Sequence, residues 1–133
     1  VVLREGRDVS VFATGIMVAE ALEAARLLEA EGISAEIINI HTLKPLDRNL
    51  VLHSAKKTGA VVTAENHSVL NALGSAVAEV LAEECPVPLT RVGVQDHFGE
   101  VGSTEFLQRK YGLTAQDIVQ AVHSSTQKRE AWK

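Results

Sequence analysis

Polar residues suited to chemistry follow four short apolar runs that have the character of β-strands. Three of the five histidines, together with several carboxyl, amide and hydroxyl groups, come directly after these runs. Because the carboxyl ends of parallel strands meet at one edge of a sheet, we expect these residues to gather at the edge where open α/β sheets bind ligands. The set consists of Thr14, Gly15, His41, Glu65, Asn66, His67, Asp96 and His97.

These residue types could form several kinds of site. Imidazole and carboxylate groups suit zinc, manganese or iron, but the three histidines lie on separate loops without a close His-x-x-x-His pair. A hydrolytic triad is disfavoured because neither Ser68 nor Ser103 lies in a Gly-x-Ser-x-Gly turn. The turn at Thr14 and Gly15 could hold an anion on helix amides, yet it lacks the Gly-x-Gly-x-x-Gly pattern and the Walker lysine. We therefore predict a rim of contacts with another domain or subunit.

The elements that must position this rim alternate between short β-branched runs and longer helical patterns, which is typical of strands joined by crossover helices. The expected strands cover residues 1–4, 9–13, 35–40, 60–64 and 89–94. The four-residue link 5–8 is too short for a parallel crossover, so we expect the first two strands to pair antiparallel. The sequence predicts an α/β fold with three layers (α/β/α) and a five-stranded mixed sheet, its first strand antiparallel to four parallel strands.

Helix limits are indicated by apolar spacing and by capping residues. Apolar positions three and four residues apart predict a helix over 17–31. Asp47 is expected to cap the next helix, and small residues at the start of a third helix, over 71–84, favour close packing. Thr114 and Asp117 have the spacing of a capping box at the start of the last helix.

Length and composition limit the class of protein. The 133 residues suit one domain, which we place at 1–133 with a frayed tail over 124–133. A formal charge of −4 disfavours nucleic acid and anionic membranes as partners, and no apolar run reaches the roughly 20 residues of a membrane span. A single cysteine, Cys85, fits a cytoplasmic location. Because the chain begins with Val1 rather than methionine, we expect it to be part of a longer or processed protein.

Segments found in order along the chain carry a resemblance to a known family. The most specific are Lys-Pro-Leu-Asp within 42–47 and Glu-Asn-His, which precedes a Gly-Ser-Ala-Val helix. Together with 10–15, 18–25 and 91–99, they resemble the carboxy-terminal domain of the transketolase family over nearly the whole chain. The ending Asp-His-Phe-Gly-Glu-Val-Gly at 96–102 is most similar to the carboxy-terminal subunit of two-part transketolases.

The resemblance implies an enzyme that depends on thiamine diphosphate, with its catalytic parts elsewhere. In this family a Gly-Asp-Gly domain holds the diphosphate and its magnesium, and a glutamate in a second domain activates the cofactor. Neither motif stands in this sequence. The resemblance therefore implies no cofactor in this chain, thiamine diphosphate and magnesium in the complete enzyme, and an inactive isolated chain.

The resulting hypothesis is a third, non-catalytic domain of a transketolase-type enzyme, which moves a two-carbon ketol unit between sugar phosphates, as in the pentose phosphate pathway. Its expected partners are the thiamine-binding domains or subunit of the same enzyme within a homo-oligomer such as a dimer. One alternative is the same domain of a deoxyxylulose-phosphate synthase or of a 2-oxo-acid dehydrogenase beta subunit. Another is an independent module that binds an anion or a metal at the sheet rim.

Overall fold

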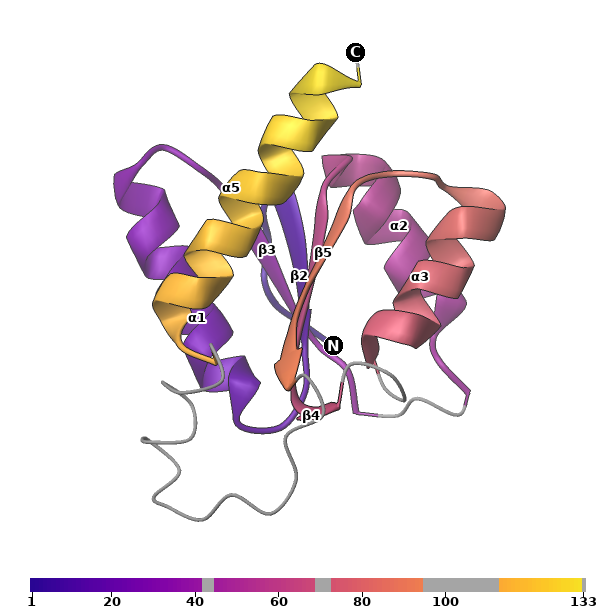
Figure 1. The fold of residues 1–133 in the computed structure, drawn as a ribbon, viewed down its shortest axis with the longest axis horizontal. Helices are drawn as coiled ribbons and strands as arrows, with labels where there is room; N and C mark the ends of the chain where they lie inside the picture. The colour runs from indigo at the N-terminus through magenta and orange to yellow at the C-terminus, as the bar shows by residue number, and fades with distance from the viewer. Residues whose placement is uncertain (42–44, 69–72, 95–112, 133) are drawn as a thin grey trace.

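The computed structural model describes residues 1–41, 45–68, 73–94 and 113–132, with the backbone alone for 66–68 and 94. The described elements follow in the order β1 (Val2–Arg4), β2 (Val9–Ala13), α1 (Met17–Ala30), β3 (Ala35–Asn39), α2 (Arg48–Thr58), β4 (Val61–Ser68), α3 (Leu73–Glu84), β5 (Leu89–Val94) and α5 (Ala115–Ala131). The predicted fold class is confirmed, since these elements form a five-stranded mixed sheet with helices on both faces (Figure 1).

The sheet has the strand order β1-β3-β2-β4-β5. β2 lies at its centre and pairs in parallel with β3 and with β4, and β4 pairs in parallel with β5. All five residues of β2 are buried, as expected for a parallel strand that helices cover on both faces. β1 is the antiparallel edge strand.

The predicted pairing of the first two strands is wrong, because β1 pairs with β3 instead. Both edges of β2 are already bonded to β3 and β4. The link before β2 crosses the start of β3, where the amides of Arg7 and Asp8 donate to the Ser34 carbonyl oxygen. Gly6 is buried in this crossing, and a Cβ there would lie 2.3 Å from the Ala35 carbonyl carbon. The crossing therefore delivers β1 to the far side of β3.

Two apolar layers flank the sheet. α1 and α5 cover one face and α2 and α3 cover the other (Figure 1). Because successive strand residues point to opposite faces, Val11 and Ile37 belong to the core under α1 and α5. Phe12 and Ile38, the next residue in each strand, belong to the core under α2 and α3.

The capping residues act as the sequence predicts. The Asp47 carboxylate accepts a hydrogen bond from the Leu50 amide at 3.1 Å and begins α2. Thr114 and Asp117 form a complete capping box at the start of α5. These bonds satisfy amides in the first turn that have no partner within the helix.

The end of the chain differs from the expected frayed tail over 124–133, because α5 continues to Ala131. Ser125 is fully buried and its hydroxyl donates to the Val61 carbonyl oxygen at 2.8 Å. One turn later, the Arg129 guanidinium donates to the Thr58 carbonyl oxygen at 2.8 Å. These contacts with β4 and α2 hold the last turns of the helix in place. None of the described helices combines the length and apolar composition of a membrane span.

Candidate functional site

The carboxyl edge of the sheet brings together three of the predicted segments. Ala13 lies level with Asn39 on one side and with Ala64 on the other. The Thr14 amide donates to the Ala64 carbonyl oxygen at 3.1 Å, and the Ile40 amide donates to the Ala13 carbonyl oxygen at 3.0 Å. The residues that follow β2, β3 and β4 therefore begin at the same edge, as the sequence predicts.

Thr14 and Gly15 form the turn that leads into α1. The Met17 amide donates to the Thr14 carbonyl oxygen and the Val18 amide to the Gly15 carbonyl oxygen, each at 3.2 Å. Gly15 has a φ of 59°, in the left-handed region that favours glycine. Thr14 is half-buried and Gly15 is exposed. The geometry supports the simpler interpretation of this segment, a tight turn that requires glycine.

Glu65 lies at the same edge of the sheet, where its carboxylate bonds within the domain. Its side chain is 1% exposed. Its carboxylate accepts hydrogen bonds from the Leu73 amide at 3.0 Å and from the Gly74 amide at 2.8 Å. A carboxylate at a helix amino end is favoured both by these unpaired amides and by the helix dipole. Glu65 thus acts as the anion at the amino end of α3, and its contact with another domain or subunit stays a prediction.

Close packing surrounds this cap. A Cβ at Gly74 would lie 2.9 Å from the Arg91 Cδ and 3.2 Å from the Thr63 hydroxyl oxygen. The Thr63 hydroxyl is buried and has no hydrogen-bond partner within the described part of the chain. The small residues at the start of the third helix therefore do permit the close approach that the sequence predicts.

The remaining rim residues are placed only in part. His41 is exposed just beyond β3. Asn66 and His67 belong to β4, for which the structure describes the backbone at these positions, and Asp96 and His97 lie outside the described residues. Among the described ranges, no three His, Cys, Asp or Glu side chains come close enough to hold a metal ion.

A buried polar cluster that sequence reasoning missed lies on the α2 side of the sheet. Glu36 of β3 is 2% exposed. Its carboxylate accepts from the Ser54 hydroxyl at 2.6 Å and from the Gly6 amide at 3.2 Å, and it pairs with the Lys57 ammonium. The Ser10 hydroxyl lies 2.6 Å from that of Ser54 and extends the cluster into β2.

The surroundings of Glu36 set its charge. Burial works to raise the pKa of this carboxyl, but the bonds from Lys57, Ser54 and the Gly6 amide together lower the pKa below its ordinary value of 4.5. The signal in the sequence was a glutamate inside an apolar strand with Ser10 as its neighbour in register. The cluster links β3, α2 and the link before β2, so it stabilises the fold.

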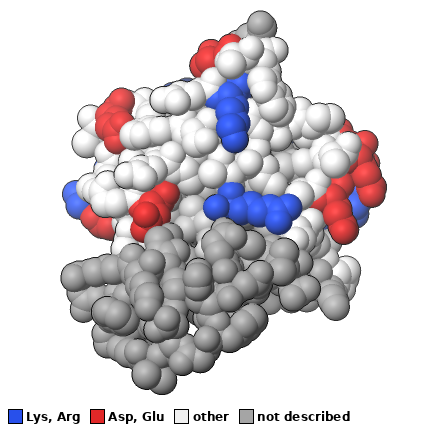
Figure 2. Space-filling view, viewed as in Figure 1, with Lys and Arg blue, Asp and Glu red and all other residues white. Residues whose placement is uncertain are grey.

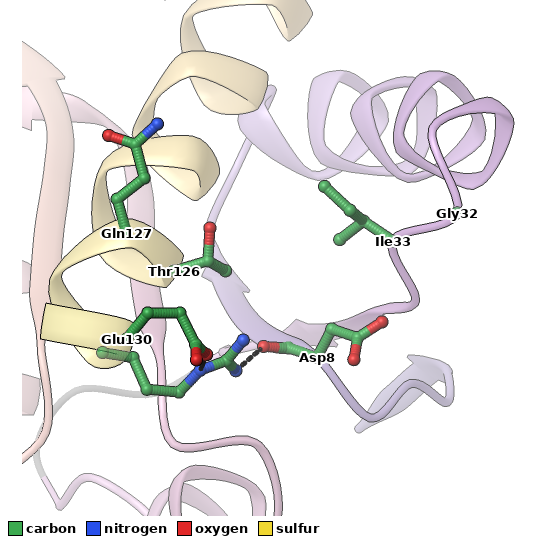
Figure 3. A pocket seen from close by; sticks show the side chains of 7 residues that line it. Asp8, Gly32, Ile33, Thr126, Gln127 and Glu130 are labelled. Atoms are coloured by element: carbon green, nitrogen blue, oxygen red, sulfur yellow. Dashed lines mark hydrogen bonds and ion pairs between the residues drawn. The ribbon is translucent and has the colours of Figure 1, made fainter. Parts of the chain in front are cut away.

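A surface hollow of about 330 Å³ lies at the end of α5 (Figure 3). Its lining residues are Asp8, Gly32, Ile33, Thr126, Gln127, Arg129 and Glu130. The Arg129 guanidinium donates to the Asp8 carbonyl oxygen and to the Glu130 carboxylate, and the Asp8 carboxylate accepts from the Ser34 amide at 2.7 Å. These bonds connect the end of α5 to the links that precede β2 and β3, so we assign the hollow to the structure of the domain.

Comparison with known proteins gives a family and close relatives. The family model for the transketolase C-terminal domain matches residues 1–118. The chain is 63% identical over 127 residues to the 6-deoxy-6-sulfo-D-fructose transketolase subunit SqwH of Clostridium sp. strain MSTE9, covering 96% of this chain and 39% of the relative. It is 44% identical over 119 residues to the 1-deoxy-D-xylulose-5-phosphate synthase of Heliobacterium modesticaldum, covering 87% of this chain and 18% of the relative.

A solved structure agrees with this result. A split-gene transketolase, described as an inactive β4 tetramer, superposes with a TM-score of 0.92 at 57% identity. The match covers 96% of this chain and 42% of the other. The chain therefore spans well under half the length of these relatives.

Proposed function

The chain belongs to the transketolase family through its C-terminal domain, and from this premise we propose that it is the third, non-catalytic domain of a transketolase-type enzyme. Such an enzyme moves a two-carbon ketol unit between sugar phosphates. The observation that carries the proposal is the 63% identity to a transketolase subunit over 96% of the chain. The identity to deoxyxylulose-phosphate synthases is lower, at 44% for the relative from Heliobacterium modesticaldum.

The two described helix amino ends at the rim, those of α1 and α3, do not fit a diphosphate site. A diphosphate would need free amides at a helix amino end. At α3 the Glu65 carboxylate already accepts from the first amides, and at α1 the first turn bonds to Thr14 and Gly15. Thiamine diphosphate, the cofactor of the family, and its magnesium would be held by other parts of the complete enzyme.

The proposed work of the domain is assembly. Its partners would be the thiamine-binding domains or subunit of the same enzyme, together with further copies in a homo-oligomer. The relative described as a β4 tetramer supports self-assembly of this kind of subunit. We propose His41, Asn66, His67, Asp96 and His97 as contacts at the rim. A cytoplasmic location fits the lone Cys85, which would remain a thiol there.

A chimaera tests the proposed enzyme class. This chain would replace the matching 127 residues of the Clostridium relative, and the product would be assayed for ketol transfer from 6-deoxy-6-sulfo-D-fructose with all partner polypeptides present. We expect activity within about tenfold of the parent, a loss of no more than roughly 1.4 kcal/mol of transition-state stabilisation. The matched control carries the corresponding segment of the Heliobacterium synthase and should be much less active. An inactive chimaera of normal size and stability would contradict the proposal.

The second candidate, a deoxyxylulose-phosphate synthase domain, rests on the 44% identity over 87% of the chain. The reciprocal chimaera, with this chain inserted into the Heliobacterium synthase, tests it by synthase activity. Activity there without activity in the transketolase background would favour the second candidate.

The module hypothesis is tested with the chain alone. Calorimetry of the 133-residue chain with thiamine diphosphate, phosphate and zinc should give no heat of binding at micromolar concentration. Micromolar binding of any of these, about −8 kcal/mol, would instead support an independent binding module.

A further inference from the structure

Exposed apolar side chains gather along β1 and at the start of α1. Among the described residues, the large apolar side chains that are exposed are Val1, Val2, Leu3, Ile16, Leu22 and Trp132. The first three are consecutive and lie at the open edge of the sheet, because β1 pairs only with β3 in the described sheet. Apolar side chains exposed singly are ordinary, whereas a contiguous apolar patch marks an interaction site. The positions of β1 and α1 decide which of the two applies.

β1 and α1 both begin at the edge of the sheet that carries the rim. The Asn39 amide, at the end of β3, donates to the Val1 carbonyl oxygen at 2.9 Å. Ile16 directly follows the turn of Thr14 and Gly15 at the same edge. β1 is antiparallel to β3, and α1 leads back from the end of β2. Both elements therefore run away from the rim in the same direction.

An ion pair shows that β1 and α1 are neighbours. Arg4, at the end of β1, pairs with Glu29 in the last turn of α1 at 3.0 Å. Leu22 precedes Glu29 by seven residues, about two helical turns, so both lie on the same side of α1. Two helical turns and three strand residues each span roughly 10 Å, so Leu22 lies level with Val1. We call Val1, Val2, Leu3 and Leu22 the β1–α1 patch.

The β1–α1 patch ends where charged side chains begin. After Leu22, the exposed residues of α1 include Glu23 and Arg26, which pair with each other. Charged side chains of both signs lie on the α1 side of the molecule (Figure 2). Between the rim and Leu22, the exposed residues are Ile16 and Ala19, which carry no charge. An apolar centre bordered by polar groups is the usual composition of a protein interface.

The relatives indicate which protein surface covers the patch. The matching family model is that of a C-terminal domain, and its match begins at residue 1. This chain covers 39% of the Clostridium relative and 42% of the solved split-gene transketolase. In a longer protein built in this way, the preceding domain is connected to the start of β1, beside Leu22. A short connection holds two domains at a high effective concentration, which favours the preceding domain over a second copy of this chain.

We propose that the β1–α1 patch is the seat of the domain that precedes this one in the complete enzyme, and that an apolar face of that domain packs against Val1, Leu3 and Leu22. The inference rests on the proposed function, because it requires an enzyme of several domains. It extends the proposed contacts from the rim residues, such as His41, to the edge strand and to α1.

Cysteine labelling tests the proposal in the chimaera with the Clostridium relative. Leu22→Cys is introduced into the 133-residue chain and into the chimaera, and mass spectrometry follows the reaction of that peptide with a maleimide. Because the reaction requires an accessible thiol, it should be at least about tenfold slower in the chimaera. The matched control is Ala30→Cys at an exposed position in the last turn of α1, which should react at the same rate in both proteins.

An added charge gives a second, independent measurement. Leu22 is 39% exposed, so Leu22→Glu should leave the urea midpoint of the 133-residue chain unchanged. In the chimaera the new carboxylate would be removed from water without a partner, so the urea midpoint should fall. Ala30→Glu, the matched control, adds the same charge outside the patch and should lower neither midpoint.

Three outcomes would overturn the proposal: a Leu22→Cys thiol that reacts equally fast in both proteins, equal protection of the thiol at position 30, and protection in the 133-residue chain that rises with its concentration. The last result would show that a second copy covers the patch. Neither measurement needs ketol transfer. An active chimaera with an unprotected thiol would therefore refute this inference alone, whereas an inactive chimaera with a protected thiol would support it and refute only the proposed enzyme class.

Discussion

Replacing Glu36 by glutamine tests the buried cluster that joins β3 to α2. The carboxylate receives bonds from Ser54, from the Gly6 amide and from Lys57. Hydrogen bonds to a charged group contribute about 1.5–3 kcal/mol each and neutral ones about 0.5–1.5 kcal/mol. Each of the three bonds should therefore weaken by about 1 kcal/mol when the acceptor loses its charge. Together these losses should lower the free energy of unfolding by about 3 kcal/mol. Urea unfolding at pH 7 measures this loss, which is large beside a typical stability of about 5–15 kcal/mol.

The effect should depend on pH with a definite sign. The bonds hold the pKa of Glu36 in the folded state below its ordinary value of 4.5. The ionised carboxylate therefore stabilises the fold above pH 4.5, and this stability is lost as the pH falls through the folded pKa. Once Glu36 is protonated, the wild-type chain also lacks the charge. The difference in stability between wild type and Glu36→Gln should thus shrink below pH 4.5.

Glu29→Gln is the matched control. Glu29 pairs with Arg4 at 3.0 Å, but its side chain is 69% exposed. Exposed pairs contribute about 0–1 kcal/mol, so this variant should unfold close to wild type. A Glu36→Gln loss below 1 kcal/mol, or a loss that is the same at pH 3 and pH 7, would refute the argument that ionised Glu36 stabilises the fold.

Three further substitutions and one control variant, Gly32→Ala, probe other parts of the structure by urea unfolding. Glu65→Ala should lower the free energy of unfolding by about 2 kcal/mol, because two amides of α3 lose their charged acceptor; an unchanged value would argue against the cap. Gly6→Ala should lower the free energy of unfolding by about 3 kcal/mol or more, because its Cβ would overlap the backbone of β3. The control Gly32→Ala has open space around it but a φ of 78°, so it should lower the free energy of unfolding by about 1 kcal/mol. Equal losses in the two variants would contradict the predicted clash at Gly6. Thr114→Ala should cost about 1 kcal/mol through the broken capping box, and no loss would show that the cap does not stabilise α5.

The family could be recognised from the sequence alone, because its motifs are short segments that follow one another in order along the chain. The comparisons confirm it. Helix caps were equally predictable. Asp47 and Thr114 bond to amides three residues away, so their partners are visible in the sequence. Strand limits were predictable where the residues next to both ends of an apolar run indicate a turn or loop, as for β2 and β5.

Tertiary structure alone decided the features that join distant residues. The partner of β1 depended on Gly6 crossing the backbone of β3. The role of Glu65 depended on the fold returning the start of α3 to the end of β4. Glu36 acquired its partners only when α2 packed over β3. Composition and spacing determine which segments are apolar and where helices begin, whereas the choice among possible neighbours is made by the competition for buried space and hydrogen bonds in the folded chain.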